Sequence, residues 1–387
     1  MRDPQHELES LRQENLLRQL HHIENGVGSE LVIDGKRYIN FSSNDYLGLA
    51  QHPRLIDAAQ RCTQNWGTGS GSSRLICGTQ SPSQELEQDL AQAKGTQGAL
   101  VFANGYCTSV GTLSGLLKKG DTVILDKLSH ASLIDGARLS GATIRVFPHN
   151  DLQKLEKLLK SVTSKSAADQ RTIVVTEAVF SMDGDTAPLQ QIIELKNRYG
   201  AWLLVDEAHA LGIYGNTGMG LAENLGCSDQ IDLQMGTLGK AAGAAGGYIA
   251  ASNEIIELLI NRARSFIYST AAPPAQYASA RAALEIIRSA EGDRLRKKLW
   301  QNLGCFAELT QTPLPQSPII AWPVGDSAKA LKYMQDLREQ HQLIAPAIRY
   351  PTVPRNTARL RITITASHST EQIQQLCHAL RALHQPA

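Results

Sequence analysis

The chain has 387 residues, more than a single small hydrophobic core requires, so we expect one large domain with smaller ones attached. Hydrophobic residues make up 42% of the chain and charged residues 19%, a composition that excludes a mostly disordered protein. The 38 basic and 37 acidic residues nearly cancel, so no overall field gathers nucleic acid or an anionic membrane, and any anion must be held by a local site.

The six cysteines are widely scattered and include no CxxC pair. Their spacing offers neither a disulfide framework nor a structural zinc site, and we expect no metal. The first 20 residues are polar and charged, and no apolar run is long enough for a signal peptide or a membrane span. We therefore expect a cytoplasmic protein that has no nucleic-acid or membrane partner.

The N-terminal part, residues 1–50, is predicted to be an arm that precedes the main domain. Within residues 5–20, the leucines are spaced to give a helix one apolar face. In the segment 30–41 (ELVIDGKRYINF), apolar and β-branched residues flank the dipeptide Asp34-Gly35. Such a dipeptide readily adopts a hairpin turn, so this segment predicts two short strands.

Residues 51–285 are predicted to form a large α/β domain. Helical stretches alternate there with short apolar runs, which are GALVFA (98–103), TVILD (122–126), ATIRVF (142–147), RTIVVTE (171–177), AWLLVDE (201–207) and GGYIAAS (246–252). Runs of this kind indicate buried strands of a mostly parallel central sheet flanked by helices. Ligands of such sheets bind beyond the carboxyl ends of the strands, so we expect the site among the polar residues that follow these runs.

Residues 286–387 are predicted to form a smaller α+β C-terminal domain. The segments RLRKKLWQNL (294–303) and AKALKYMQDLREQ (328–340) have the spacing of amphipathic helices, and ARLRITITA (358–366) alternates as a strand does. No repeat or low-complexity linker interrupts the chain, so we expect the domains to pack closely.

Lys240 lies in the segment IDLQMGTLGKAAGAAGGYI (231–249), among small glycines and alanines and after an apolar run. Small neighbours let a flat ring and its phosphate approach the backbone, and an apolar environment leaves a lysine amine free to attack an aldehyde. Taken alone, the segment equally allows an exposed lysine on a glycine-rich surface loop.

Asp206 and His209 follow the apolar run WLLV, so they are predicted to lie at the carboxyl end of a strand. An aspartate there can pair with a protonated pyridine nitrogen, and the histidine can orient the ring or its 3-oxygen. A helix cap with a satisfied histidine is the alternative. His130, in DKLSHAS, can lay its aromatic face over the ring or can be a structural histidine.

Gly105 and Tyr106 follow another strand and open an apparent helix, which presents free backbone amides and a positive dipole end to an anion. We interpret this segment as a phosphate site, and the alternative is a plain strand-to-helix turn. Thr237 and Ser181 offer further hydroxyl groups to the phosphate or to a ring oxygen.

Together these segments resemble the α-oxoamine synthase family of fold-type-I pyridoxal phosphate (PLP) enzymes, and the resemblance runs through most of the chain. The matching segments occur in the family's order and are NFSSNDYLGLA (40–50), GTGSGSSR (67–74), NGY (104–106), DKLSHASLIDGA (126–137), TEAVFSMDGDTAPL (176–189), VDEAHALG (205–212), GTLGK (236–240), IYSTAAPP (267–274), AIRYPTVP (347–354) and ARLRITITASH (358–368).

The resemblance implies that PLP is the cofactor and that it is attached as a Schiff base to Lys240, which also transfers protons. It implies that Asp206 pairs with the pyridine nitrogen and that His130 stacks on the ring. The other cofactor contacts that it implies are Gly105, Tyr106, Ser181, His209 and Thr237.

The resemblance also implies the substrate contacts. Arg361 corresponds to the arginine that binds the carboxylate of the amino acid, as suits a bidentate guanidinium. Thr352 and His130 also face substrate, and Arg18 meets the far carboxylate of the acyl chain. Thr270 corresponds to a hydroxyl that reaches the phosphate in the partner subunit, which implies a homodimer with shared active sites.

Within the family, the segments 347–354 and 358–363 favour a member that condenses L-alanine with a pimeloyl thioester, carried by CoA or a carrier protein, in biotin synthesis. A glycine-using member, a PLP aminotransferase and a non-catalytic binding module of the same fold are the alternatives. The complete set of Lys240, Asp206, His130 and Arg361 argues against the binding module, because a scaffold does not need a base.

Overall fold

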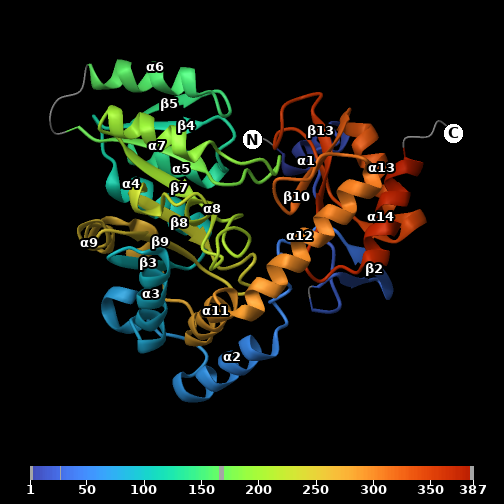
Figure 1. The fold of residues 1–387 in the computed structure, drawn as a ribbon, viewed down its shortest axis with the longest axis horizontal. Coiled ribbons are helices and arrows are strands. Elements are labelled where there is room, and N and C mark those ends of the chain that lie inside the picture. Colours follow the sequence, from blue (N-terminus) through green and yellow to red (C-terminus); the bar gives the residue numbers. More distant parts are fainter. Residues whose placement is uncertain (1–2, 27, 165–169, 384–387) are drawn as a thin grey trace. The chain divides into compact units, whose positions relative to one another are not determined.

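The computed structural model describes residues 3–26, 28–164 and 170–383, which form two compact units (Figure 1). Each unit contains segments that are distant in the sequence. The larger unit consists of Leu47–Ser181 and Asp185–Lys297, and the smaller unit consists of Met1–Tyr46, Met182–Gly184 and Lys298–Ala387.

A seven-stranded sheet forms the centre of the larger unit, with the strands in the order β3-β9-β8-β7-β6-β4-β5. The pairs that contain β9 are antiparallel, and the other pairs in this sheet are parallel. The strands are β3 (Gly98–Phe102), β4 (Thr122–Asp126), β5 (Thr143–Phe147), β6 (Thr172–Glu177), β7 (Trp202–Asp206), β8 (Leu233–Thr237) and β9 (Gly247–Ala251).

The central strands of this sheet are buried on both faces, whereas the edge strand β5 is largely exposed. Val174 and Val175 are neighbours on β6, so they point to opposite faces, and both side chains are fully buried. On one face, residues of β3, β4 and β7 pack against helices in a core that includes Leu100, Leu113, Leu125, Leu133, Leu204 and Leu259. The α-helices that lie wholly in the larger unit are α2 (Pro53–Trp66), α3 (Ser81–Lys94), α4 (Gly105–Leu116), α5 (Ala131–Ser140), α6 (Leu152–Thr163), α7 (Leu189–Arg198), α8 (Leu221–Asn224), α9 (Asn253–Arg262), α10 (Arg264–Ile267) and α11 (Pro274–Ile287).

The predicted α/β class and its mostly parallel sheet are confirmed, since all six apolar runs form strands of this sheet. Strand β8 is not predicted from the sequence. Gln234 and Gly236 interrupt its apolar character, although both are buried in the sheet.

The smaller unit contains two three-stranded sheets. One has the order β1-β2-β11 and the other, which is antiparallel, has the order β10-β13-β12. The elements are β1 (Glu30–Ile33), β2 (Lys36–Asn40), β10 (Ile319–Gly325), β11 (Leu343–Ile344), β12 (Ala347–Ile348), β13 (Ala358–Thr363), α1 (Pro4–Gln13), α13 (Ser327–His341) and α14 (Thr370–Ala382), and α12 (Ala290–Thr310) contributes its residues from Lys298 onward. The predicted helices and the strand of the C-terminal segment are confirmed, whereas the three-part division of the chain stays a prediction.

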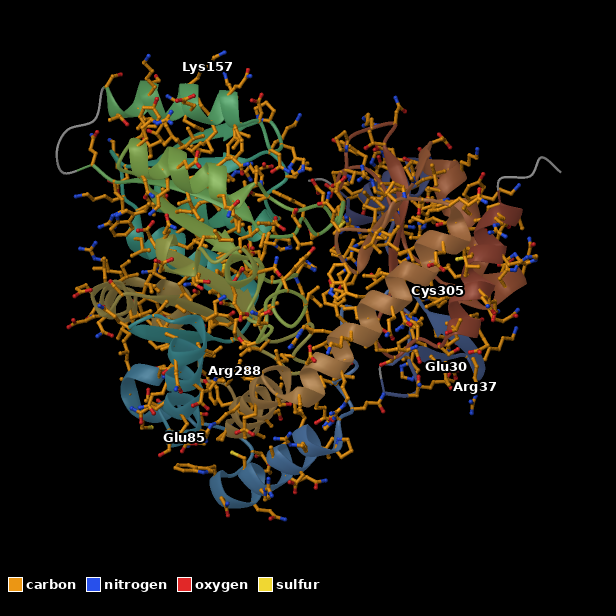
Figure 2. All side chains as sticks on the ribbon, in the orientation of Figure 1. Glu30, Arg37, Glu85, Lys157, Arg288 and Cys305 are labelled. Atoms are coloured by element: carbon orange, nitrogen blue, oxygen red, sulfur yellow. The ribbon has the colours of Figure 1, made fainter. Side chains whose placement is uncertain are left out.

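The predicted N-terminal hairpin is confirmed. Asp34 and Gly35 have φ angles of 50° and 69°, which fits the tight turn between β1 and β2, and the side chains of Glu30 and Arg37 approach within 3.8 Å across it (Figure 2). The predicted helix over residues 5–20 is wrong in its length, because α1 ends at Gln13. The chain continues without regular structure, and the side chain of Arg349 binds its carbonyl groups at residues 15 and 17.

Among the residues that the structure describes, no helix is both long enough and apolar enough to cross a bilayer.

Candidate active site

A pocket of about 200 Å³ lies in the larger unit, at the carboxyl ends of β6, β7 and β8. This is the edge at which parallel sheets bind ligands. Seven of the residues predicted from the sequence meet in it, namely Gly105, Tyr106, His130, Asp206, His209, Thr237 and Lys240. The other residues of the lining are Ser132, Glu177, Ala208 and Met235.

The amine of Lys240 is directed at His209. Lys240 Nζ lies 2.6 Å from Nε2 of the histidine, and Lys240 is only partly exposed. The alternative of a lysine on an open surface loop is therefore wrong. An imidazole at this distance can exchange a proton with the amine or orient it.

The backbone around Lys240 forms a tight connection between antiparallel strands β8 and β9. Thr237 Oγ1 donates to the carbonyl of Gly246, and the amide of Leu238 donates to the same oxygen. Gly243 in this turn has a φ of 60°, and a Cβ atom there would lie 2.4 Å from the backbone nitrogen of Ala50. The turn thus requires glycine both for its conformation and for its close packing.

Asp206 ends β7 and presents a buried carboxylate to the pocket. The residue is 5% exposed, and Oδ1 accepts a hydrogen bond from the amide of Ala208 at 2.9 Å. Burial raises the pKa of Asp206, while the nearby charge of Lys240 lowers it. A carboxylate buried to this extent is stable as an anion only with a cationic partner.

Glu177 is a second buried carboxylate in the pocket. It is among the polar residues at the strand ends where the site is expected, although no role is predicted for it from the sequence. It ends β6 directly beside Asp206 on β7, and it accepts a hydrogen bond from the amide of His130 at 2.6 Å. Burial raises the pKa of Glu177, and the charge of Asp206 raises it further. The signal in the sequence was its place at the end of the apolar run TIVVT.

His130 precedes α5 and caps its first turn, with Nδ1 accepting from the amide of Ser132 at 3.3 Å and lying 2.7 Å from the serine hydroxyl. Desolvation lowers the pKa of His130, and the charge of Lys240 lowers it further, whereas Asp206 opposes the shift. The ring is thus favoured in its neutral form, which suits stacking on a flat ligand.

Gly105 and Tyr106 begin α4, whose N-terminus opens into the pocket. The side chain of Asn104 caps the helix by accepting from the amide of Cys107 at 2.8 Å, and the hydroxyl of Tyr106 donates to Asp135 at 2.9 Å. A Cβ atom at Gly105 would lie 3.6 Å from the Cβ of Thr237, so the glycine leaves space beside that side chain. The helix dipole and the free amides together suit a phosphate.

Among the residues described, the pocket lining includes neither Ser181 nor Thr270. Ser181 is buried in the segment that follows β6, and its backbone donates a hydrogen bond to Glu177. Thr270 is exposed and pairs with Ser73 of the glycine-rich segment through an isolated β-bridge.

Arg361 lies on β13 of the smaller unit and is 5% exposed. Its Nη1 donates to Thr363 Oγ1 and its Nη2 to Asn44 Oδ1, both at 3.1 Å. Burial raises the pKa of Tyr46 to about 12, although the neighbouring Arg361 lowers it. These neutral partners fix the orientation of the guanidinium without cancelling its charge.

Arg18 and Thr352, the other two predicted substrate contacts, also belong to the smaller unit, and both are exposed. Arg349 binds the carbonyl groups of Asn15 and Leu17, which places Arg18 near a second guanidinium. Burial lowers the pKa of Arg349, and the charge of Arg18 lowers it further.

The residues in the pocket fit PLP. The buried carboxylate of Asp206 matches a protonated ring nitrogen, the amine of Lys240 matches the aldehyde, and the start of α4 matches the phosphate.

Comparisons with known proteins agree with this geometry. Residues 36–380 match the family described as "Aminotransferase class I and II". The chain is 44% identical over 379 residues to the 8-amino-7-oxononanoate synthase of Geobacter sulfurreducens, a match that covers 97% of this chain and 96% of the relative. It is 42% identical over 371 residues to the enzyme of the same name from Thermoanaerobacter pseudethanolicus, a match that covers 95% of this chain and 92% of the relative.

Solved structures give the same picture. The serine palmitoyltransferase of S. paucimobilis with a bound PLP–myriocin adduct matches with a TM-score of 0.90 and 32% identity over 98% of this chain and 96% of that one. The 8-amino-7-oxononanoate synthase of Francisella tularensis matches with a TM-score of 0.74 and 28% identity, over 89% of this chain and 96% of that one. The chain therefore belongs to the aminotransferase class I and II family of fold-type-I PLP enzymes, as an α-oxoamine synthase.

Proposed function

We propose that the protein catalyses the 8-amino-7-oxononanoate synthase reaction, in which L-alanine condenses with a pimeloyl thioester and releases the thiol and CO₂. The choice of substrates is supported by the relatives of that name at 42–44% identity over nearly the whole chain. The observation that carries the chemistry is the pocket in which the Lys240 amine lies 2.6 Å from His209, with the buried carboxylate of Asp206 in the same lining.

Bound PLP supplies an electron sink for the α-carbon of the amino acid that is joined to it. Asp206 is proposed to hold the proton on the ring nitrogen, because a buried carboxylate favours a cation beside it. His130 is proposed to cover one face of the ring and to exclude water from it. Gly105, Tyr106 and Thr237 are proposed to bind the phosphate at the start of α4, where free amides point outward.

Lys240 is the proposed base. Its amine would remove the α-proton from alanine held in the pocket. His209, whose Nε2 lies 2.6 Å from the amine, is proposed to orient it. His209 and Ser181 are also proposed to contact the 3-oxygen of the ring. The same amine can return a proton to the α-carbon after CO₂ has left.

Arg361 is the proposed ligand of the alanine carboxylate, since its guanidinium is held in place by Thr363 and Asn44. Arg18 is proposed to bind the far carboxylate of the pimeloyl chain, and Thr352 to contact substrate. The exposure of Arg18 suits a site that an acyl chain reaches from solvent.

A homodimer with shared active sites is also proposed. Thr270 pairs with Ser73, and each is followed or preceded closely in the chain by an exposed apolar side chain. Ile76, three residues after Ser73, is 80% exposed, and Tyr268, two residues before Thr270, is 71% exposed. Large apolar side chains with such exposure favour an interface between subunits. In such a dimer, Thr270 would contact the phosphate of the PLP that the second copy binds.

The test is an assay of the purified protein with PLP and pimeloyl-CoA, offered separately L-alanine, glycine or L-serine, with release of CoA and of CO₂ measured together. We expect turnover with L-alanine, and no detectable turnover for Lys240→Ala. Lys157→Ala, a matched change of an exposed lysine on α6, should leave the rate unchanged (Figure 2).

Faster release of CoA with glycine or L-serine than with L-alanine would contradict the substrate assignment while leaving the family intact. Conversion of PLP to its amine form by an amino acid alone, as the main reaction, would instead indicate an aminotransferase. Near-normal condensation by Lys240→Ala would contradict the proposed base.

A further inference from the structure

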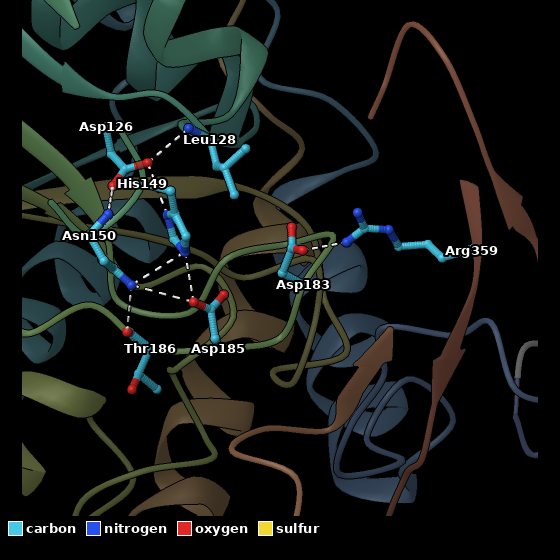
Figure 3. A network of polar contacts seen from close by, with 8 residues as sticks. All are labelled: Asp126, Leu128, His149, Asn150, Asp183, Asp185, Thr186 and Arg359. Atoms are coloured by element: carbon cyan, nitrogen blue, oxygen red, sulfur yellow. Dashed lines mark hydrogen bonds and ion pairs between the residues drawn. The ribbon is translucent and has the colours of Figure 1, made fainter. Parts of the chain in front are cut away.

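A histidine outside the pocket lining lies between two aspartates from different segments, Asp126 at the end of β4 and Asp185 in the segment that follows β6. His149 Nδ1 is 3.1 Å from Asp126 Oδ1, and His149 Nε2 is 2.7 Å from Asp185 Oδ2 (Figure 3). The ring also packs edge-on against Phe180, with 4.3 Å between the centroids. One rigid side chain therefore joins the end of β4 to the segment that follows β6.

On the first side, Asp126 organises the loop that leads to His130. Its carboxylate is fully buried and accepts from the amides of Leu128 at 2.8 Å and of Asn150 at 2.9 Å. Its carbonyl accepts from the amide of Ser129. The course of the backbone from β4 to His130 thus depends on one buried anion.

On the second side, Asp185 belongs to a hairpin whose outgoing strand leads to Ser181. The amide of Phe180 donates to the carbonyl of Asp185 at 3.0 Å, and Ala187 donates to Ala178 at 3.2 Å. Asn150 also donates to the carbonyl of Thr186 at 3.2 Å, so the segment next to His149 holds the returning strand of the hairpin (Figure 3).

We propose that His149 is a positioning residue, which holds the loop of His130 and the hairpin of Ser181 together by bridging Asp126 and Asp185. This inference rests on the proposed roles of His130 and Ser181 at the cofactor.

The chemistry of the imidazole suits this task. A protonated ring donates from two nitrogens on opposite sides, so it can satisfy two carboxylates at once, and each bond is charge-assisted. Burial lowers the pKa of His149, but hydrogen bonds and charge from Asp126 and Asp185 outweigh burial and raise the pKa to about 10. The fully buried Asp126 thereby has the cation that a buried anion requires.

The test is hydrogen exchange on the apo protein, combined with titration of the apo protein with PLP followed by absorbance. In His149→Gln, we expect the amides of Leu128 and Phe180 to exchange at least about tenfold faster and the dissociation constant of PLP to rise by about tenfold, as the loss of a charge-assisted contact implies. His52→Gln is the matched control, since His52 forms one ion pair, with Glu291 at 3.2 Å, on another surface of the unit.

Asp185→Asn is a second variant, which keeps the side-chain shape and weakens only the hairpin side. We expect faster exchange at Phe180 and an unchanged rate at Leu128. Unchanged exchange at both loops in His149→Gln would overturn the inference, and so would faster exchange without weaker binding of PLP. Neither measurement uses a substrate, so an error in the proposed substrates would leave this result unaffected.

Discussion

Lys94 and Glu207 form an ion pair whose loss has a calculable cost. The side chains are 1% and 0% exposed, and Lys94 Nζ also donates to the carbonyl of Met219 at 2.6 Å. The second oxygen of Glu207 accepts from the amide of Ala222 at 2.9 Å. Glu207 lies between Asp206 and Ala208 in the chain, so the pair holds the backbone between two residues of the pocket lining.

Replacing Lys94 by Met leaves the carboxylate of Glu207 without its cation in a site that water does not reach. Removing one partner of a buried pair costs about 3–5 kcal/mol. Such a loss is a large fraction of the roughly 5–15 kcal/mol that stabilises a typical domain. We therefore expect Lys94→Met to lower the free energy of unfolding by about 3–5 kcal/mol.

The assay is urea denaturation of the apo protein, followed by fluorescence and by circular dichroism. Lys196→Met is the matched control, because the pair of Lys196 with Asp232 is partly exposed, with the aspartate at 27%. We expect that control to lose less than about 2 kcal/mol. Adding Glu207→Gln to Lys94→Met removes the unpaired charge and keeps an acceptor for Ala222, so the double variant should recover at least half of the loss.

Two outcomes would refute this reasoning. One is a loss of less than about 1 kcal/mol in Lys94→Met, which would mean that water or a nearby group compensates the charge. The other is a double variant no more stable than the single one, which would place the cost in packing and not in the uncompensated carboxylate.

Three further predictions concern the turn at Gly243, the ring of His149 and the guanidinium of Arg361. Gly243→Ala should weaken PLP binding and lower the urea midpoint of unfolding more than Gly95→Ala does. A methyl group at Gly243 would lie 2.4 Å from the backbone nitrogen of Ala50, whereas a methyl group at Gly95, which has a φ of 66°, would have no atom within 4 Å. Equal losses in the two variants would contradict the steric argument. The pKa of His149 is raised from 6.5 to about 10, so its protonated form stabilises the fold fully below pH 6.5 and loses that contribution as pH rises through 10. The difference in urea midpoint between wild type and His149→Gln should therefore shrink over this range, and a constant difference would count against a charged imidazole. Arg361→Lys should raise the KM for L-alanine by at least about tenfold and change the apparent affinity for pimeloyl-CoA less, because an ammonium group cannot reproduce a bidentate contact. An unchanged KM would contradict the proposed contact between Arg361 and the carboxylate of alanine.

Much of the fold was predictable because buried parallel strands have continuous apolar runs in their sequence. Strand β8 was not, because Gln234 interrupts its run. Gln234 is 1% exposed, and its amide nitrogen donates to the carbonyls of Lys94 and Ser228. These partners lie on other segments, so no local pattern in the sequence could indicate that this polar residue belongs to a strand.

The position of Asp206 in the pocket was predictable, since it follows an apolar run and parallel strands end at one edge of the sheet. Lys240 was predictable from the small residues around it and not from the strand that precedes it. Glu177 occupies the same kind of position as Asp206, but only its register beside Asp206 shows that it belongs to the lining. The extent of α1 was not predictable, because Arg349, which is distant in the chain, binds the carbonyls of residues 15 and 17 that a longer helix would have used internally.

The reversed direction of β9 has a consequence for synthesis of the protein on the ribosome. Strand β3 lies at the edge of the sheet, and its partner there is β9, which follows Lys240 in the chain. Gly247 of β9 also packs against Gly105, since a Cβ atom there would lie 2.7 Å from the Gly105 backbone. The part of the pocket that Gly105 lines therefore cannot form until β9 has left the exit tunnel, and a ligand of the pocket can stabilise only chains that have been translated beyond that point.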